Sequence, residues 1–126
     1  MAKIVIATRV PGDVAEILRG HSIVEPPHDH ASLSEPALRA ALVDADALLS
    51  VVSLRIDAAL FDLAPRLRIV ANFGEGYDNV DLDEAAARGI TVTNTPDVLT
   101  AATADLTMAL LLGAARRLPE GTALVR

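Results

Sequence analysis

The chain has 126 residues, the size of one ordinary domain; 52% of them are hydrophobic and only 2% are aromatic. The formal net charge of −6 argues against nucleic acid as a partner, because neutralising phosphates requires clustered Lys and Arg. The absence of Cys excludes disulfides, thiolate metal sites and a cysteine nucleophile.

No targeting or membrane segment is evident in the sequence. The first residues, MAKIVIATRVPGD, have too short an apolar core for a signal peptide, and no small-residue cleavage site follows them. No apolar run approaches the ~18 residues that span a bilayer. We therefore expect a cytoplasmic location and no membrane partner.

Apolar runs alternate with helical patterns along the chain. The runs predict strands at residues 3–8, 22–24, 47–52, 67–72 and 90–94. Helices are expected at 13–18, 36–43, 57–63 and 82–88, with Ser34 capping the second. Asp81 and Glu84 form a capping-box-like pair before the fourth helix, and Gly89 ends it.

Strands that alternate with helices predict an α/β fold with a parallel sheet, because each crossover returns on the same hand. For one domain of this length we expect a flavodoxin-like, five-stranded sheet in the order 2-1-3-4-5, with helices on both faces.

The last predicted helix, residues 101–117, differs from the others. Its sequence, AATADLTMALLLGAARR, is apolar around most of its circumference, which predicts packing against something outside the domain. Thr100 or Thr103 either caps this helix or donates its hydroxyl to a ligand, and Pro119 is expected to end it. We place a domain boundary after residue 98, so that the α/β domain is 1–98 and this helix belongs to 99–126.

The segment NFGEGYDNVD, residues 72–81, contains a Gly-x-Gly turn after a predicted strand. It is not a complete dinucleotide fingerprint, because Asn79 stands where the third glycine is required. Two interpretations remain open. Either Gly74 and Gly76 shape a backbone concavity that binds an anion, or they supply positive φ angles for a tight turn.

Other sites are not supported by the sequence. The run His28-Asp29-His30 lacks a further ligand cluster at a plausible spacing, so we expect no metal site. A phospho-receiver domain would need acidic residues after the first and third strands and a Lys after the fifth, and a flavin-phosphate site would need a loop rich in Ser, Thr and Gly after the first. The segments ATRVPG, SVVSLR and TNTPDV provide neither set.

Residues 68–119 resemble the D-isomer-specific 2-hydroxyacid dehydrogenases, and most of all the glyoxylate/hydroxypyruvate reductase branch, with phosphoglycerate dehydrogenase as a more distant relative. The matching motifs are G-x-G-x-D-N-V-D, A-x-x-G-I-x-V-x-N-T-P, and T-A-D-L followed by an apolar helix and R-R-L-P. The resemblance implies a flavodoxin-like substrate domain joined through a long helix to a Rossmann domain. It also implies NAD or NADP as cofactor and a small 2-oxoacid, such as glyoxylate or hydroxypyruvate, as substrate.

The resemblance assigns only part of the site to these residues. The family's G-x-G-x-x-G loop and its catalytic Arg, Glu and His have no counterpart here, so no catalytic residue is assigned and the chain alone is expected to be inactive. Backbone amides of Glu75 and Gly76 match the substrate-carboxylate loop, and Glu75 also approaches the cofactor. The resemblance further places Ser53, Leu54 and Leu99 at the substrate and Thr103 at the cofactor.

One departure from the family concerns charge. The position of Glu75 is usually small or neutral, and a carboxylate about 4 Å from a bound carboxylate would cost up to ~4 kcal/mol at an effective dielectric of ~20. The family resemblance also implies a homodimer through the helix that runs from Ala101 to Leu112. The alternative function is a self-associating interaction or folding module without catalysis, driven by the same exposed apolar helix.

Overall fold

A computed structural model describes residues 1–28 and 31–125, which form two compact units, Met1–Thr95 and Pro96–Arg126. The division between them lies before the domain boundary expected after residue 98. Each unit is described by itself.

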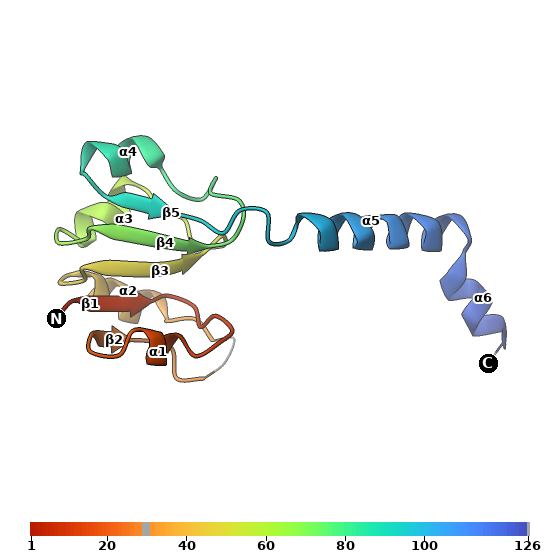
Figure 1. The fold of residues 1–126 in the computed structure, drawn as a ribbon, viewed down its shortest axis with the longest axis horizontal. Coiled ribbons are helices and arrows are strands. Elements are labelled where there is room, and N and C mark those ends of the chain that lie inside the picture. Colours follow the sequence, from red (N-terminus) through yellow and green to blue (C-terminus); the bar gives the residue numbers. More distant parts are fainter. Residues whose placement is uncertain (29–30, 126) are drawn as a thin grey trace. The chain divides into compact units, whose positions relative to one another are not determined.

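The first unit contains a parallel sheet whose strand order confirms the flavodoxin-like prediction (Figure 1). The order is β2-β1-β3-β4-β5, and every pairing between neighbours is parallel. The strands are β1 (Lys3–Ile6), β2 (Ser22–Val24), β3 (Ala47–Val51), β4 (Ile69–Phe73) and β5 (Thr91–Thr93). Predicted and observed strands differ by no more than two residues at either end.

Three of the four helices described in this unit begin where an aspartate side chain satisfies one of the first free N–H groups. The four are α1 (Val14–Ile17), α2 (Glu35–Leu42), α3 (Ala58–Leu63) and α4 (Leu82–Ala87). The carboxylates of Asp13, Asp57 and Asp81 each accept a hydrogen bond from the N–H three residues later. Ser34 is the N-cap residue of α2, but its hydroxyl makes no capping bond.

The capping-box prediction at α4 is only half right. Asp81 accepts from the Glu84 N–H at 3.0 Å, as expected, but the Glu84 carboxylate accepts from Arg88 Nε at 3.2 Å. The Asp81 N–H donates instead to the carbonyl of Ile56 at 2.9 Å. A contact to a neighbouring loop therefore replaces the local partner.

The core lies between one face of the sheet and helices α2, α3 and α4. Alternate strand residues supply it, as in Val5, Leu48 and Val70, which are fully buried, and Phe61 of α3 packs among them. Because the connection from β1 to β2 runs opposite to the later ones, the right-handed crossover rule places α1 on the other face. Helices were expected on both faces of the sheet. On this second face the expectation is met only by α1, a single helical turn.

The second unit consists of α5 (Thr100–Ala115) and α6 (Leu118–Val125). Pro119 was expected to end the apolar helix but instead lies in the first turn of α6, where its missing N–H costs nothing. The chain bends at Arg117, whose φ is 52°. Neither Thr100 nor Thr103 caps α5; Leu99 is the N-cap residue and makes no side-chain capping bond.

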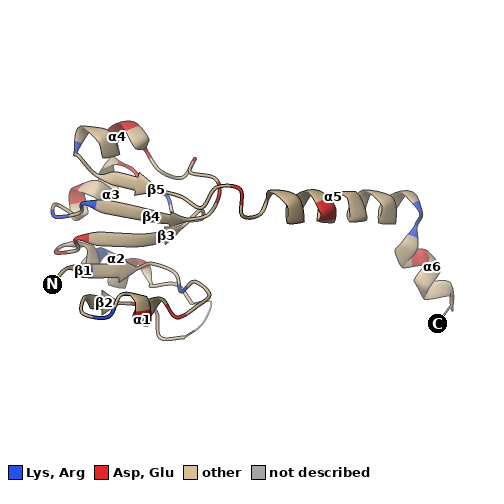
Figure 2. Cartoon of the chain, viewed as in Figure 1, with Lys and Arg blue, Asp and Glu red and all other residues tan. Residues whose placement is uncertain are grey.

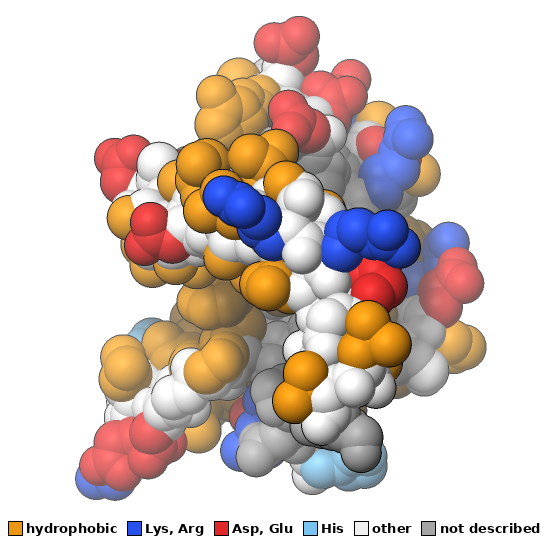
Figure 3. Space-filling model, turned by 90° about the vertical axis from the view of Figure 1, so that its right-hand side faces the viewer, with side chains coloured by type: hydrophobic (Ala, Val, Ile, Leu, Met, Phe, Trp, Pro, Cys, Tyr) orange, Lys and Arg blue, Asp and Glu red, His pale blue; other side chains and the backbone are white. Residues whose placement is uncertain are grey.

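Helix α5 carries a single charged side chain, that of Asp105, so its surface is mostly apolar (Figure 2). None of its residues is buried. Between a half and two-thirds of the surface of Leu106, Leu110 and Leu112 is exposed. Exposed hydrophobic side chains are also visible among charged ones on the space-filling surface (Figure 3). None of the described helices is long and apolar enough to cross a bilayer.

Candidate functional site

Two loops meet at the carboxyl edge of the sheet, where open α/β sheets bind ligands. Residues 52–55 follow β3 and residues 74–79 follow β4. A single parallel bridge between Ile56 and Val80 joins the far ends of the loops, and the Ile56 N–H donates to the Asn79 carbonyl at 2.8 Å. The two loops are therefore held side by side.

A buried asparagine at the end of β4 organises the second loop. Asn72 is 2% exposed, and its Oδ1 accepts a hydrogen bond from the Ser50 hydroxyl of β3 at 2.9 Å. Its Nδ2 donates to the Gly76 carbonyl at 3.0 Å, and the Asn72 and Asn79 amides pair with each other at 3.2 Å. Asn79 then donates to the Leu54 carbonyl at 2.8 Å, which connects the two loops.

A third asparagine holds the same loop from the side of β5. Asn94 Nδ2 donates to the Glu75 carbonyl at 2.8 Å, and the Thr95 N–H donates to the Gly74 carbonyl at 3.0 Å. The carbonyls of three consecutive residues, 74 to 76, are thus all tied to neighbouring groups. Sequence reasoning missed the roles of Asn72, Asn79 and Asn94, although asparagine at the end of an apolar strand was an available signal.

The amide N–H groups of the 74–79 loop point away from the hydrogen bonds that hold its carbonyls. A trans peptide places the N–H of one residue opposite the C=O of the residue before it. Since the Glu75 and Gly76 carbonyls are held by Asn94 and Asn72, the N–H groups of Gly76 and Tyr77 face the other way. Among the described residues, neither of these two N–H groups has a protein acceptor.

The two glycines of the loop have different reasons to be glycine, and positive φ is not one of them. The described glycines with φ in the left-handed region are Gly12, Gly20 and Gly89, so that interpretation of Gly74 and Gly76 is wrong. A Cβ on Gly74 would lie 2.3 Å from Cγ1 of Val52, so a side chain there requires Val52 to shift. A Cβ on Gly76 would meet nothing closer than Asp78 Oδ2, at 3.8 Å.

Four of the sequence-predicted site residues lie in these loops. Ser53 and Gly76 are exposed, whereas Leu54 and Glu75 are half-buried. Leu99 and Thr103 belong to the second unit, where the Thr103 N–H donates to the Leu99 carbonyl at 2.8 Å. Both of these residues are exposed.

A groove of about 430 Å³ runs along the two loops, between Ser53 and Arg55 on one side and Asp78 and Asp81 on the other. The side chain of Arg55 pairs with Asp57 at 2.9 Å. This hydrogen bond, followed by the one from the Leu60 N–H, lowers the pKa of the Asp57 carboxyl. The groove is acidic overall, because the one arginine is already paired and further carboxylates face it.

No group of three or more His, Asp or Glu side chains in the described residues is arranged to hold a metal ion. His28 is exposed; Asp29 and His30, the other members of the histidine run, lie outside the described residues. His21 is also exposed and lies at the opposite edge of the sheet, where its Nδ1 accepts from the Ala2 N–H at 3.4 Å.

Comparison with known proteins gives one consistent result. Residues 4–118 match the family model described as "D-isomer specific 2-hydroxyacid dehydrogenase, catalytic domain". A glyoxylate reductase of Thermococcus onnurineus is 48% identical over 124 residues, which are 98% of this chain and 37% of that protein. The chain therefore spans a little over a third of the length of this curated relative.

Solved structures agree with the sequence comparison. A protein of Thermus thermophilus is 41% identical with a TM-score of 0.85, and the match covers 98% of this chain and 40% of that one. The NADPH-dependent glyoxylate/hydroxypyruvate reductase of Sinorhizobium meliloti, in complex with NADP and malonate, is 38% identical with a TM-score of 0.65. That match covers 89% of this chain and 34% of the reductase.

Proposed function

The chain belongs to the D-isomer-specific 2-hydroxyacid dehydrogenase family, and we propose that it supplies the substrate side of an enzyme that reduces a small 2-oxoacid to a D-2-hydroxyacid. The names of its relatives support glyoxylate or hydroxypyruvate as the substrate class. One of the related reductases holds malonate, which shows that a small carboxylate binds to that protein.

The observation that carries this proposal is the arrangement of the 74–79 loop. Its carbonyls are tied to Asn72, Asn94 and Thr95, so its amides are directed outward and held rigid before any ligand arrives. Outward amides on successive residues form a favourable site for a carboxylate. Gly76 is exposed, and neither its φ nor its packing requires a glycine, which fits a place where a ligand approaches the backbone. We propose that the loop backbone at Glu75 and Gly76 binds the substrate carboxylate, with the outward N–H groups of Gly76 and Tyr77 as donors, beside Ser53 and Leu54.

Two carboxylates oppose this role and set an upper limit on affinity. Glu75 belongs to the loop itself, and Asp78 Oδ2 lies 3.8 Å from the position of a Gly76 Cβ. Sequence reasoning identified the first of these charges and missed the second. A cation from outside residues 1–126 is the simplest means of balancing them when substrate binds. The family arginine would have this role.

The nicotinamide cofactor of the family does not fit the Gly-x-Gly loop through its pyrophosphate. Asn79 replaces the third glycine and is held between both loops, and the Asp81 carboxylate occupies the N-terminus of α4. We therefore place the phosphates of NAD or NADP outside these residues and assign no hydride-transfer step to them. Leu99 and Thr103 are proposed to lie beside the nicotinamide, as the family resemblance implies.

The second unit is proposed to be the leading helix of a nucleotide-binding domain, residues 99–126, and the basis of a homodimer through Ala101 to Leu112. The exposure of the α5 leucines supports self-association. The same observation favours the alternative function, a self-associating module without catalysis. We propose that residues 1–126 alone do not reduce glyoxylate.

Carboxylate binding separates these two functions. Titration of the ¹⁵N-labelled chain with glyoxylate is expected to shift the amide signals of Glu75, Gly76 and Tyr77 and to leave Gly12 and Gly20 unchanged. Chloride at equal ionic strength serves as the control for nonspecific screening. Uniform small shifts, or shifts confined to α5, would remove the carboxylate site and leave the self-associating module.

A further inference from the structure

The last two residues of the first unit, Asn94 and Thr95, hold the 74–79 loop. Asn94 Nδ2 donates to the Glu75 carbonyl at 2.8 Å, and the Thr95 N–H donates to the Gly74 carbonyl at 3.0 Å. Both residues are half-buried. Each hydrogen bond fixes one peptide plane, so these two residues orient two successive planes of the loop. We call Asn94 and Thr95 the exit pair.

The exit pair acts directly on the proposed carboxylate site. The peptide plane between Glu75 and Gly76 contains the carbonyl that Asn94 holds. It also contains the Gly76 N–H, which points the opposite way and is proposed to donate to the substrate. Because the plane is rigid, a displacement of Asn94 that pulls on this carbonyl also turns the Gly76 N–H.

The chain leaves the first unit through a stiff residue and then a strained one. Pro96 follows the exit pair, and its ring fixes its own φ and favours an extended Thr95. Asp97 has a φ of 62°, in the left-handed region that few residues other than glycine adopt. Both Pro96 and Asp97 are exposed. A change in the backbone of Asp97 is passed to the exit pair, because the ring of Pro96 leaves little freedom between them.

We propose that the exit segment, residues 94–97, couples the backbone conformation of Asp97 to the affinity of the carboxylate site. The left-handed Asp97 keeps the exit pair in position, and Asn94 acts as a positioning residue for the Gly76 N–H. The coupling is reciprocal, because two events that favour the same state of a protein favour each other. A carboxylate bound at the loop therefore favours the left-handed conformation of Asp97. This regulation rests on the proposed function, because its ligand is the carboxylate of that site.

The test compares two substitutions of Asp97 that are matched in charge. Asp97→Asn and Asp97→Val both remove the carboxylate, but asparagine tolerates the left-handed region and a β-branched residue does not. In the ligand-free ¹⁵N-labelled chain, Asp97→Val is expected to move the amide signals of Gly76 and Tyr77, whereas Asp97→Asn leaves them unchanged. In the glyoxylate titration, Asp97→Val should bind about fivefold more weakly than Asp97→Asn.

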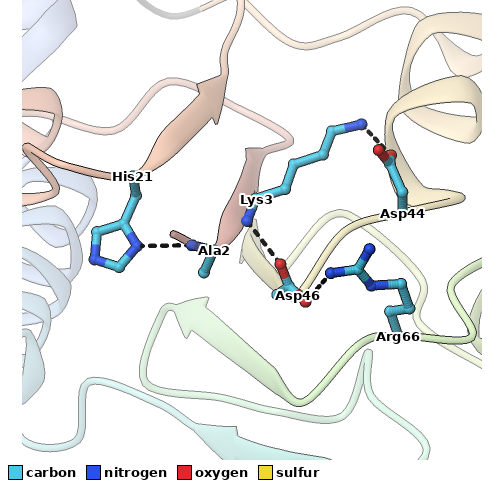
Figure 4. Close-up of polar contacts among 6 residues, drawn as sticks. All are labelled: Ala2, Lys3, His21, Asp44, Asp46 and Arg66. Atoms are coloured by element: carbon cyan, nitrogen blue, oxygen red, sulfur yellow. Dashed lines mark hydrogen bonds and ion pairs between the residues drawn. The ribbon is translucent and has the colours of Figure 1, made fainter.

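Two further variants identify the path of the coupling. In an Asn94→Ala background, the difference between the two Asp97 substitutions should shrink, because one of the two hydrogen bonds to the loop is gone. Asp46→Ala is the control at the opposite, amino edge of the sheet. There Asp46 accepts from the Lys3 N–H at 2.8 Å and from the Arg66 guanidinium at 3.0 Å (Figure 4). This variant loosens the first unit away from the loop, so the loop signals and the affinity should not change.

Equal effects of Asp97→Asn and Asp97→Val on the ligand-free Gly76 signal would overturn the coupling, and so would an equally large effect of Asp46→Ala. An undiminished difference in the Asn94→Ala background would overturn the role of Asn94. If Asp97→Val is insoluble, Asp97→Thr replaces it, because threonine is also β-branched. Glyoxylate that moves no loop signal in any variant would instead overturn the proposed function. A ligand-free Gly76 signal that responds to Asp97→Val alone would still support the coupling.

Discussion

Replacing Asn72 with alanine should destabilise the first unit more than any other single change at the candidate site. Asn72 is 2% exposed and exchanges hydrogen bonds with Ser50, Gly76 and Asn79 at 2.9–3.2 Å. At about 1 kcal/mol net for each partner, their loss amounts to about 3 kcal/mol. The Ser50 hydroxyl, which is fully buried, would also be left without its acceptor.

The effect is measurable by urea unfolding followed by far-UV circular dichroism, since the chain has no Trp and a single Tyr. A loss of about 3 kcal/mol corresponds to a fall of roughly 12–24 °C in the Tm of a unit of this size. Ser50→Ala should cost only about 1 kcal/mol, because Asn79 still donates to Asn72 Oδ1. The double variant should lose less than the sum, because it leaves no stranded hydroxyl. Strict additivity, or a cost below about 1 kcal/mol for Asn72→Ala, would refute the reasoning.

Three further predictions concern the same edge of the sheet. Glu75→Gln should tighten glyoxylate binding in the amide titration, because a negative charge near the bound carboxylate is removed. Unchanged affinity would mean that the Glu75 carboxylate does not lie near the bound glyoxylate. Gly74→Ala should cost about 1–3 kcal/mol in the urea assay, because its Cβ would lie 2.3 Å from Val52, with Gly121→Ala in an open helix position as the harmless control. The Arg55 hydrogen bond lowers the pKa of Asp57 below 3.8, so this carboxylate stabilises the fold above that pH and loses its contribution as the pH falls through the lower folded-state value. Asp57→Asn should therefore flatten the decline of Tm in acid, and an equally steep decline would contradict this.

The sequence was sufficient to predict the sheet because its signals are local or periodic. Strand residues such as those of 47–52 form short apolar runs, and Asp57 and Asp81 cap helices three residues away. The family motifs predicted the family that the comparison then confirmed. Errors occurred where a local signal competed with a longer-range one. Pro119 opens a helix rather than ending one, and Glu84 pairs with Arg88 instead of completing the capping box.

The candidate site depended more heavily on tertiary structure. The sequence placed Glu75 and Gly76 in a loop after a strand. It left open whether that loop is a turn that needs positive φ angles or a site that binds an anion. Only the packed structure shows that a side chain at Gly74 would collide with Val52, and that Gly76 is not required by any protein contact. Asp78 is also recognisable as a neighbour of Gly76 only in three dimensions.

The sequence by itself determined the order of the elements, the parallel sheet and the family, because periodicity, caps and motifs act over a few residues. Tertiary structure decided how the site is built. Asn79 reaches the carbonyl of Leu54, 25 residues away, and Asn94 reaches that of Glu75, 19 residues away. Asparagines follow no regular spacing in the sequence, and they occur in many kinds of loop. Their partners therefore become identifiable only when parallel strands bring their carboxyl ends together. The face of the sheet on which each helix of the first unit packs was decided in the same way, by the order in which the strands pair.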